Sequence, residues 1–269
     1  KLGSPPAGEV TADVEGDAAG GYVETVAEIC ERILSRAGFS GSDIDTVAFS
    51  ALASAAPQPV GIYIADERMF DEVLDEVLGS IGAWLLPNRF GVWEIGRRQA
   101  PSGTPVVTIT DEDVLTGQWV LASDEGQGLP AWRVKAKWGR NWAPLSQVAG
   151  VVAESIQARL RQEWRESAAA DINVLLQYPD AYSLEMDTLL ANAADADAEA
   201  LRELTLRATH RDHLQLDVAL VDSMADLDLG AVVEVDSPRF LGSSAPKLMT
   251  VTGAGTTGRR GRYSLTLWG

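Results

Sequence analysis

The C-terminal run of residues 213–268 constrains the fold of this chain more than any other stretch. Its apolar segments are short, rich in branched side chains and bounded by turn residues. Apolar residues alternate with others at 214–220, which is the period of a strand with one buried face. Segments at 232–235, 248–251 and 263–268 follow after connections too short for crossover helices. The run therefore predicts four strands in antiparallel sequence.

The composition is that of a globular protein with a sizeable core. Of 269 residues, 46% are hydrophobic and 23% are charged, which excludes a disordered chain. The formal net charge of -17 argues against duplex nucleic acid as a partner, because binders of duplexes carry a basic footprint. No apolar run approaches the roughly 20 residues of a membrane helix, so we expect no membrane segment. The single cysteine, Cys30, excludes an internal disulfide and is predicted in the core.

Three regions are expected along the chain. Residues 1–20 are rich in Gly and Pro and predict an extended arm that continues a domain preceding this sequence. Residues 21–110 mix helical and strand patterns and predict a small α+β module. Residues 111–269 predict a β-rich closing domain, with a helix at about 192–207 that packs on the C-terminal strands. The fold class is therefore α+β and β-rich.

Two helices are predicted in the α+β module. The first covers 23–37, where an apolar stripe is accompanied by Thr25 and Glu28 at the spacing of a capping box. The second runs to about Ser80 and is expected to be capped by Asp66.

Strands are predicted on both sides of these and later segments. In the α+β module the patterns fall at 60–65, 83–86, 92–95 and 105–110. The middle two form a hairpin, where Asn88 and Gly91 tolerate positive φ. In the closing domain the strand patterns fall at 118–122, 132–138 and 183–190. Residues 157–166 fit either a helix or a strand.

Two sequence patterns imitate cofactor sites. Residues 253–258 read GAGTTG, the dinucleotide fingerprint, but that motif must open a helix, and here a basic turn and a strand follow. We predict a hairpin loop instead. His210 and His213 form an isolated pair without the further ligands that zinc requires. Three acids imitate the start of an EF-hand loop, namely Asp195, Asp197 and Glu199. The sixth position lacks the glycine of that loop, so no metal or cofactor is expected.

Two basic sets stand out on this acidic chain. Strand alternation places Arg133, Lys135 and Lys137 on one face. The second set, in the last turn, is Arg259, Arg260 and Arg262. Single-stranded nucleic acid or plain solvation would explain them, but we interpret both as subunit-interface candidates that meet acidic faces of neighbouring subunits.

Eight tryptophans are many for a chain of this length. Most lie in predicted strands, where alternation favours core or interface anchors. A glycan site remains an alternative, because paired carboxylates beside tryptophan platforms suit sugar binding or cleavage. Its candidate residues are Asp111, Asp113, Trp93 and Trp119.

Three stretches together resemble phage tail proteins of the baseplate-hub or tail-tip family. The first is VTADVEGDAAGGYVETVAEICERILSRAG, and the second is VGIYIADERMFDEVLDEVLGSIGAWLLPNRFGVWEIGR. The third combines LQLDVALVDSMADLDLGAVVEVDSPRF, KLMTVTGAG and YSLTLWG. The resemblance implies an antiparallel β-barrel-like domain with one packed helix. It carries no catalytic residues over, so it implies a structural protein rather than an enzyme.

The same resemblance implies a role and partners. Hub proteins form a ring, usually a trimer, that closes the tail tube and joins it to fibres or a spike. We therefore expect a homo-trimer in the intact protein, made in the bacterial cytoplasm and located in the virion tail, with other tail proteins as partners. The alternative is a carbohydrate-binding or glycoside-cleaving tail protein.

Overall fold

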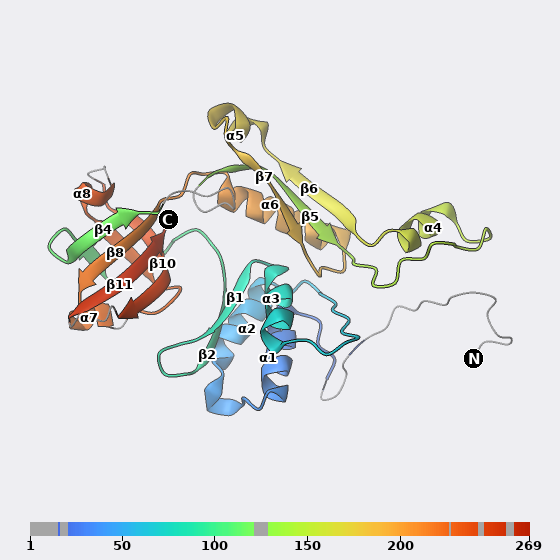
Figure 1. The fold of residues 1–269 in the computed structure, drawn as a ribbon, viewed down its shortest axis with the longest axis horizontal. Helices are drawn as coiled ribbons and strands as arrows, with labels where there is room; N and C mark the ends of the chain where they lie inside the picture. Colours follow the sequence, from blue (N-terminus) through green and yellow to red (C-terminus); the bar gives the residue numbers. More distant parts are fainter. Residues whose placement is uncertain (1–15, 17–20, 121–128, 226, 242–244, 257–260) are drawn as a thin grey trace.

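The computed structural model describes Gly16 and residues 21–120, 129–225, 227–241, 245–256 and 261–269. Within them the chain is α+β and β-rich, as predicted. Three modules are visible in Figure 1. We call them the N-terminal module (residues 21–98), the insert module (residues 131–207) and the sheet module (residues 106–119 and 213–269). The predicted arm at 1–20 lies outside the described residues except for Gly16.

The N-terminal module packs helices beside a β-hairpin (Figure 1). Its elements are α1 (Val26–Arg36), the 3-10 helix η1 (Gly41–Asp43), α2 (Thr46–Ala55), α3 (Phe70–Gly79), β1 (Ala83–Pro87) and β2 (Trp93–Arg97). The predicted capping box is present, because Thr25 Oγ1 accepts from Glu28 N while the Glu28 side chain accepts from Thr25 N. Cys30 is fully buried, as predicted, and burial raises the pKa of its thiol to about 12.

Several predictions in this module need correction. Asp66 does not cap a helix, since α3 begins at Phe70 and its N-cap Met69 makes no side-chain cap bond. Residues 60–65 form no strand, and only Val60 makes a bridge, to Leu190. The predicted hairpin is confirmed.

The two residues predicted for the hairpin turn, Asn88 and Gly91, stabilise it in different ways. Gly91 has φ 79°, the left-handed region that favours glycine. Asn88 contributes its side chain instead: its Oδ1 accepts from Phe90 N at 2.9 Å and from Val92 N at 3.1 Å. The amide side chain therefore holds the turn that the sequence indicated.

The sheet module is one six-stranded sheet in the order β3-β9-β10-β11-β8-β4. Its strands are β3 (Thr108–Thr110), β4 (Val114–Trp119), β8 (His213–Ala219), β9 (Val232–Asp236), β10 (Lys247–Thr256) and β11 (Arg262–Trp268), with α7 (Asp222–Ala225) and α8 (Pro238–Leu241) between strands. The four C-terminal strands are confirmed, and their mutual pairs are antiparallel. The sheet is not a closed barrel, because β3 and β4 stand at its ends, and β3 runs parallel to β9.

The insert module lies between β4 and β8 in the chain. It comprises β5 (Ala131–Trp138), α4 (Glu154–Arg161), β6 (Arg165–Ala170), α5 (Ile172–Gln177), β7 (Tyr182–Asp187) and α6 (Ala193–Arg207). The sheet order is β6-β5-β7, with β5 and β7 parallel. The segment 157–166 contains both the end of a helix and the start of a strand. The predicted helix at 192–207 is confirmed as α6, but it packs on β5 and β6 rather than on the C-terminal strands.

One hydrophobic cluster joins the N-terminal and insert modules, while α6 and the insert sheet enclose a separate small cluster of Val134, Ala136, Ala200 and Leu204. Trp138, Leu189 and Leu190 of the insert module belong to the same buried cluster as the residues of α1, α2 and α3. Leu189 N also donates to Ser80 Oγ at 3.0 Å across the boundary. The division into an α+β module at 21–110 and a closing domain at 111–269 stays a prediction.

Candidate functional site

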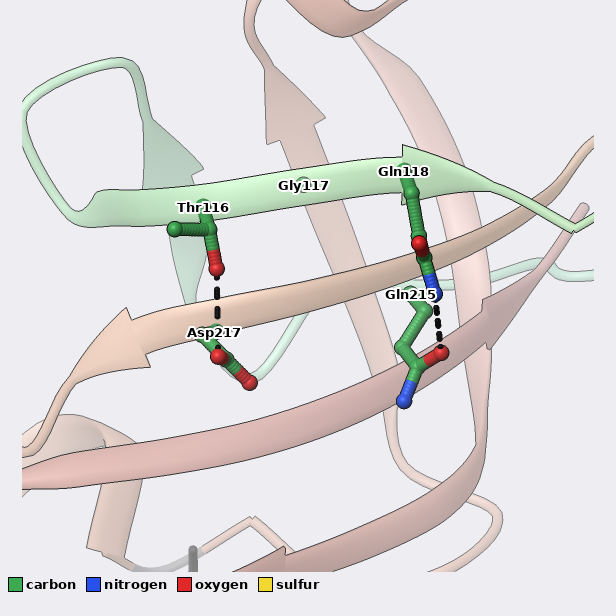
Figure 2. A pocket seen from close by; sticks show the side chains of 5 residues that line it. All are labelled: Thr116, Gly117, Gln118, Gln215 and Asp217. Carbon is green, nitrogen blue, oxygen red and sulfur yellow. Dashed lines mark hydrogen bonds between the residues drawn. The ribbon is translucent and has the colours of Figure 1, made fainter. Parts of the chain in front are cut away.

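A strip of polar side chains crosses the outer strands of the sheet module, and Figure 2 shows its five residues. They are Thr116, Gly117 and Gln118 of β4 with Gln215 and Asp217 of β8, and they line a shallow hollow of about 210 Å³. Thr116 Oγ1 donates to Asp217 Oδ2 at 3.1 Å. Gln118 Nε2 donates to Gln215 Oε1 at 2.8 Å. We call this set the polar strip.

The polar strip is suited to contact rather than to catalysis. Asp217 is the ionisable group among its five residues, and its partner is a hydroxyl rather than a general acid or base. The side chains face one another across an antiparallel pair, in register. Among the described residues, β4 is the end strand of the sheet, so its outer backbone edge pairs with no other described strand.

Gly117 is required where it stands by a close approach from the other face of β4. A Cβ at this position would lie 2.6 Å from the Phe240 ring and 2.7 Å from the Leu216 side chain. Phe240 belongs to α8, so this short helix covers the glycine of an edge strand. The polar strip therefore has an aromatic side chain packed behind it.

The predicted face of β5 is present, but its lysines are paired. Val134 and Ala136 are buried on the opposite face, as alternation predicts. Lys135 Nζ lies 2.9 Å from Glu185, and Lys137 Nζ lies 2.9 Å from Asp187, on the parallel neighbour β7. The hydrogen bond and charge of Asp187 raise the pKa of Lys137. The face is thus a ladder of both charges, which includes Arg133.

The second basic set is described only at its end. Arg262 opens β11 and pairs with Ala219 of β8. Arg259 and Arg260 lie outside the described residues. The preceding glycine pattern needs a correction, since 253–256 are not a loop but continue β10 against β11.

The structure does not gather the predicted glycan residues into one groove. Asp111 accepts a hydrogen bond from the Ser237 hydroxyl, and Asp113 accepts from Thr110 N at 2.9 Å. Both carboxylates thus stabilise the turn between β3 and β4. Trp119 ends β4 and is 45% exposed. Trp93 lies apart from these three, in the N-terminal module.

Trp93 has a packing role. It lies against the hydrophobic core of the N-terminal module, and its ring meets that of Phe39 edge-on at 5.4 Å between centroids. In the described part of the chain, no group of three His, Cys, Asp or Glu residues could hold a metal ion. His210 Nδ1 lies 3.9 Å from Asp212 instead. None of the described helices has the length and apolar character that crossing a bilayer requires.

A buried charge network, which the sequence did not indicate, joins α6 to the hairpin of the N-terminal module. Glu199 and Glu203 of α6 are 2% and 1% exposed. Glu199 accepts from Arg97 of β2 and from Arg202, and Glu203 accepts from Arg202 and from Arg207. Helical spacing in α6 could have predicted the pairs within the helix. No local sequence pattern indicates that Arg97 pairs with Glu199, because the two residues are 102 positions apart in the chain.

The network is also tied to the backbone of the N-terminal module. Arg97 Nε and Arg202 Nη2 both donate to Ile81 O, at 2.9 and 3.1 Å. Desolvation raises the pKa of Glu203, but the charges and hydrogen bonds of Arg202 and Arg207 more than offset this and lower it overall. The carboxylate is therefore ionised in the interior, where its partners compensate the loss of water.

Comparison with known proteins places the fold among tail proteins. No protein-family model and no curated protein sequence matches the chain. Three solved structures are similar over 91% of it: the tail protein from Neisseria meningitidis MC58 (12% identity, TM-score 0.55), the virion of the native gene transfer agent particle (15%, 0.56) and the 43 kDa tail protein of prophage MuSo2 from Shewanella oneidensis (15%, 0.51). The chain spans 66%, 47% and 65% of those chains. At these identities the likeness shows the fold alone, which is shared with tail proteins and does not distinguish a baseplate hub from other parts of a tail.

Proposed function

We propose that this chain is a structural subunit of the tail of a phage, prophage or phage-like particle. In this proposal it forms the baseplate hub or tail-tip ring that joins the tail tube to fibres or a spike, without enzymatic turnover. The observation that carries the proposal is the shared fold, which extends over 91% of the chain in two tail proteins and a virion. The protein would be made in the bacterial cytoplasm and would reside in the virion tail, with other tail proteins as partners.

The contacts between the modules support a structural role. A ring subunit must transmit load, so its modules need fixed relative positions. The N-terminal and insert modules share a hydrophobic cluster and are cross-linked by Arg97, Arg202 and Glu199. Trp84 of β1 reaches the sheet module, where a Cβ on Gly230 would lie 3.0 Å from its ring. These contacts favour one rigid subunit over three loosely tethered modules.

The edge of the sheet module supports assembly into a ring. Strand β4, the end strand of the sheet among the described residues, carries Leu115 and Trp119, which are 42% and 45% exposed. Exposed apolar side chains on an edge strand favour pairing with a neighbouring chain. The basic sets stay candidates for the same purpose. The Lys135 and Lys137 ladder has both charge signs, so we expect it to contribute to specificity and orientation more than to affinity.

The mass of the intact protein in solution tests the proposal. We expect light scattering of the intact protein over a range of concentrations to give a trimer. Trp119→Lys should weaken the trimer, because a charge replaces an apolar contact on the edge. Val47→Lys is the matched control, since Val47 is 77% exposed on α2, away from that edge. A monomer at every concentration would contradict the ring.

We retain a carbohydrate-binding or glycoside-cleaving tail protein as the second candidate, because exposed Trp119 directly follows Gln118 of the polar strip. This candidate predicts glycan binding that Trp119→Ala abolishes, or a fall in the turbidity of a peptidoglycan suspension. A silent glycan array together with constant turbidity would exclude it.

A further inference from the structure

A cavity of about 370 Å³ opens where the three modules meet. The N-terminal module contributes Trp84, Arg97 and Arg98, and α6 contributes Arg207. The sheet module contributes His213 and Trp268, among others. The walls thus combine guanidinium groups with two indole rings. This is the composition of a site for an anionic ligand that has an apolar part.

Arg98 lines this cavity, and no carboxylate among the described residues is bonded to its guanidinium. Glu199 and Glu203, the two carboxylates of the adjoining network, are engaged by Arg97, Arg202 and Arg207. The Arg98 backbone is fixed, because its N–H donates to Gly82 O at 3.0 Å and its carbonyl accepts from Arg202 Nη1 at 2.9 Å. Its guanidinium makes no hydrogen bond or ion pair with any residue that the structure describes. Among the described residues, this positioned cation at the cavity wall therefore has no carboxylate bonded to it directly.

The electrostatics around Arg98 point the same way. Desolvation lowers the pKa of Arg98, and the positive charge of Arg207 lowers it further. Glu203 opposes this only in part. An anion in the cavity would relieve both effects, since it would replace lost hydration and offset the repulsion between the two guanidinium groups.

His213 supplies a second unmatched polar group. Its Nδ1 is buried and has no hydrogen-bond partner among the described residues, and the residue lines the cavity. Buried polar atoms are normally hydrogen-bonded, so this ring nitrogen lacks a partner in the described part of the chain. Because other atoms of His213 line the cavity, a rotation of the imidazole would turn the nitrogen towards a ligand there. A neutral imidazole can donate one hydrogen bond from a ring nitrogen.

We propose that this cavity binds a carboxylate, with Arg98 as its cationic anchor, His213 as a second donor, and Trp84 and Trp268 against the apolar part of the ligand. An organic carboxylate fits better than phosphate, because Trp84 and Trp268 can contact an apolar part that phosphate lacks, while the Arg98 guanidinium matches the planar carboxylate. The carboxylate belongs either to a small apolar acid or to an acidic side chain of a peptide. All the residues come from one chain, so the site is complete without the ring and independent of the proposed tail function.

Calorimetric titration of the whole chain tests this inference, and two probe pairs distinguish the sources. The first pair is indole-3-acetate and its amide, and the second is acetyl-Leu-Asp-Leu-amide and its Asn counterpart. We expect at least one acid to bind about tenfold or more tightly than its neutral partner, which is the scale of a charge-assisted bidentate pair. Stronger binding by the free acid or by the peptide identifies the source.

Variants assign the binding to Arg98. Arg98→Gln should weaken binding of the acid about tenfold and leave binding of the neutral partner unchanged. Arg133→Gln, on the distant β5 face, is the matched control and should bind as the parent chain does. The proposal is overturned if neither acid binds at millimolar concentration, if acid and neutral partner bind equally, if inorganic phosphate binds as tightly, or if Arg98→Gln has no effect. The acid-against-amide comparison needs no variant, so it holds even if Arg98→Gln fails to fold.

Discussion

At the scale of single residues, the ionised groups in the interior depend on the partners that compensate their charge. Glu203 is 1% exposed and bonded to Arg202 and Arg207 of its own helix. A buried ion pair contributes little net stability relative to an apolar pair. Removal of one partner, however, leaves the other charge buried without water or a counter-charge. The main effect of losing the carboxylate is therefore the uncompensated arginine charge that would remain in the interior.

Glu203→Gln should lower the free energy of unfolding at pH 7 by about 3 kcal/mol, the cost of an uncompensated buried charge. Because the pKa of Glu203 is lowered in the folded chain, its contribution is complete above the unfolded carboxyl pKa and is lost as pH falls through the folded pKa. The difference between the two proteins should shrink accordingly below about pH 4. Urea denaturation at several pH values measures it.

The control for this prediction is Glu185→Gln. Glu185 pairs with Lys135 on the exposed ladder, where solvent screens the interaction, so the free energy of unfolding should barely change. Equal effects of the two substitutions would contradict the role assigned to burial.

At the scale of elements, helix ends show which local signals the chain uses. Both α1 and α6 begin after a residue type that favours the N-cap position. Thr25 makes the reciprocal bonds of a capping box with Glu28. Asn192 makes no side-chain cap bond, and its amide donates to Asp195 instead. Two residues of types that favour the N-cap position thus differ in whether their side chains cap the helix.

Thr25→Ala should therefore destabilise the chain by about 1 kcal/mol, because the backbone donor Glu28 N loses its acceptor Thr25 Oγ1 and the Glu28 carboxylate loses the Thr25 hydroxyl. Asn192→Ala should cost clearly less. Thermal unfolding followed by circular dichroism compares the two, and an equal shift in Tm would show that the capping geometry has no energetic weight.

At the scale of the whole molecule, a shared hydrophobic cluster couples the N-terminal and insert modules, whereas the sheet module has a separate hydrophobic core. Leu190 is fully buried in the shared cluster and bridges to Val60. Met249 is fully buried in the core of the sheet module. These two positions therefore report on different cooperative units.

Leu190→Ala should cost about 2–5 kcal/mol, because it removes a buried side chain and leaves a cavity. Hydrogen exchange should accelerate in α1 and α3 as well as in β7 and α6, with the sheet module protected as before. Met249→Ala should give the reverse pattern. Uniform loss of protection in both variants would mean that the three modules unfold as one.

Sequence periodicity was sufficient for elements whose pattern is strong and local. The α1 stripe with its Thr25 cap, the hairpin of β1 and β2, and the four C-terminal strands all follow from nearest-neighbour spacing. Helix α2 was missed, and its weakly amphipathic sequence TVAFSALASA explains why. The lysine face of β5 was predicted correctly, but the acids of β7 that neutralise it were not.

The amino-acid sequence by itself thus determined the class, the strongest helices, the hairpin and the C-terminal strands, since these depend on spacing along the chain. Tertiary structure alone decided the insertion between β4 and β8, the parallel pair β3–β9, the pairing of Arg97 with Glu199, and the cavity beside Arg98. The physical reason is that a buried charge and an edge strand acquire their partners from residues far away in the chain. Such contacts leave no periodic trace in either partner's local sequence.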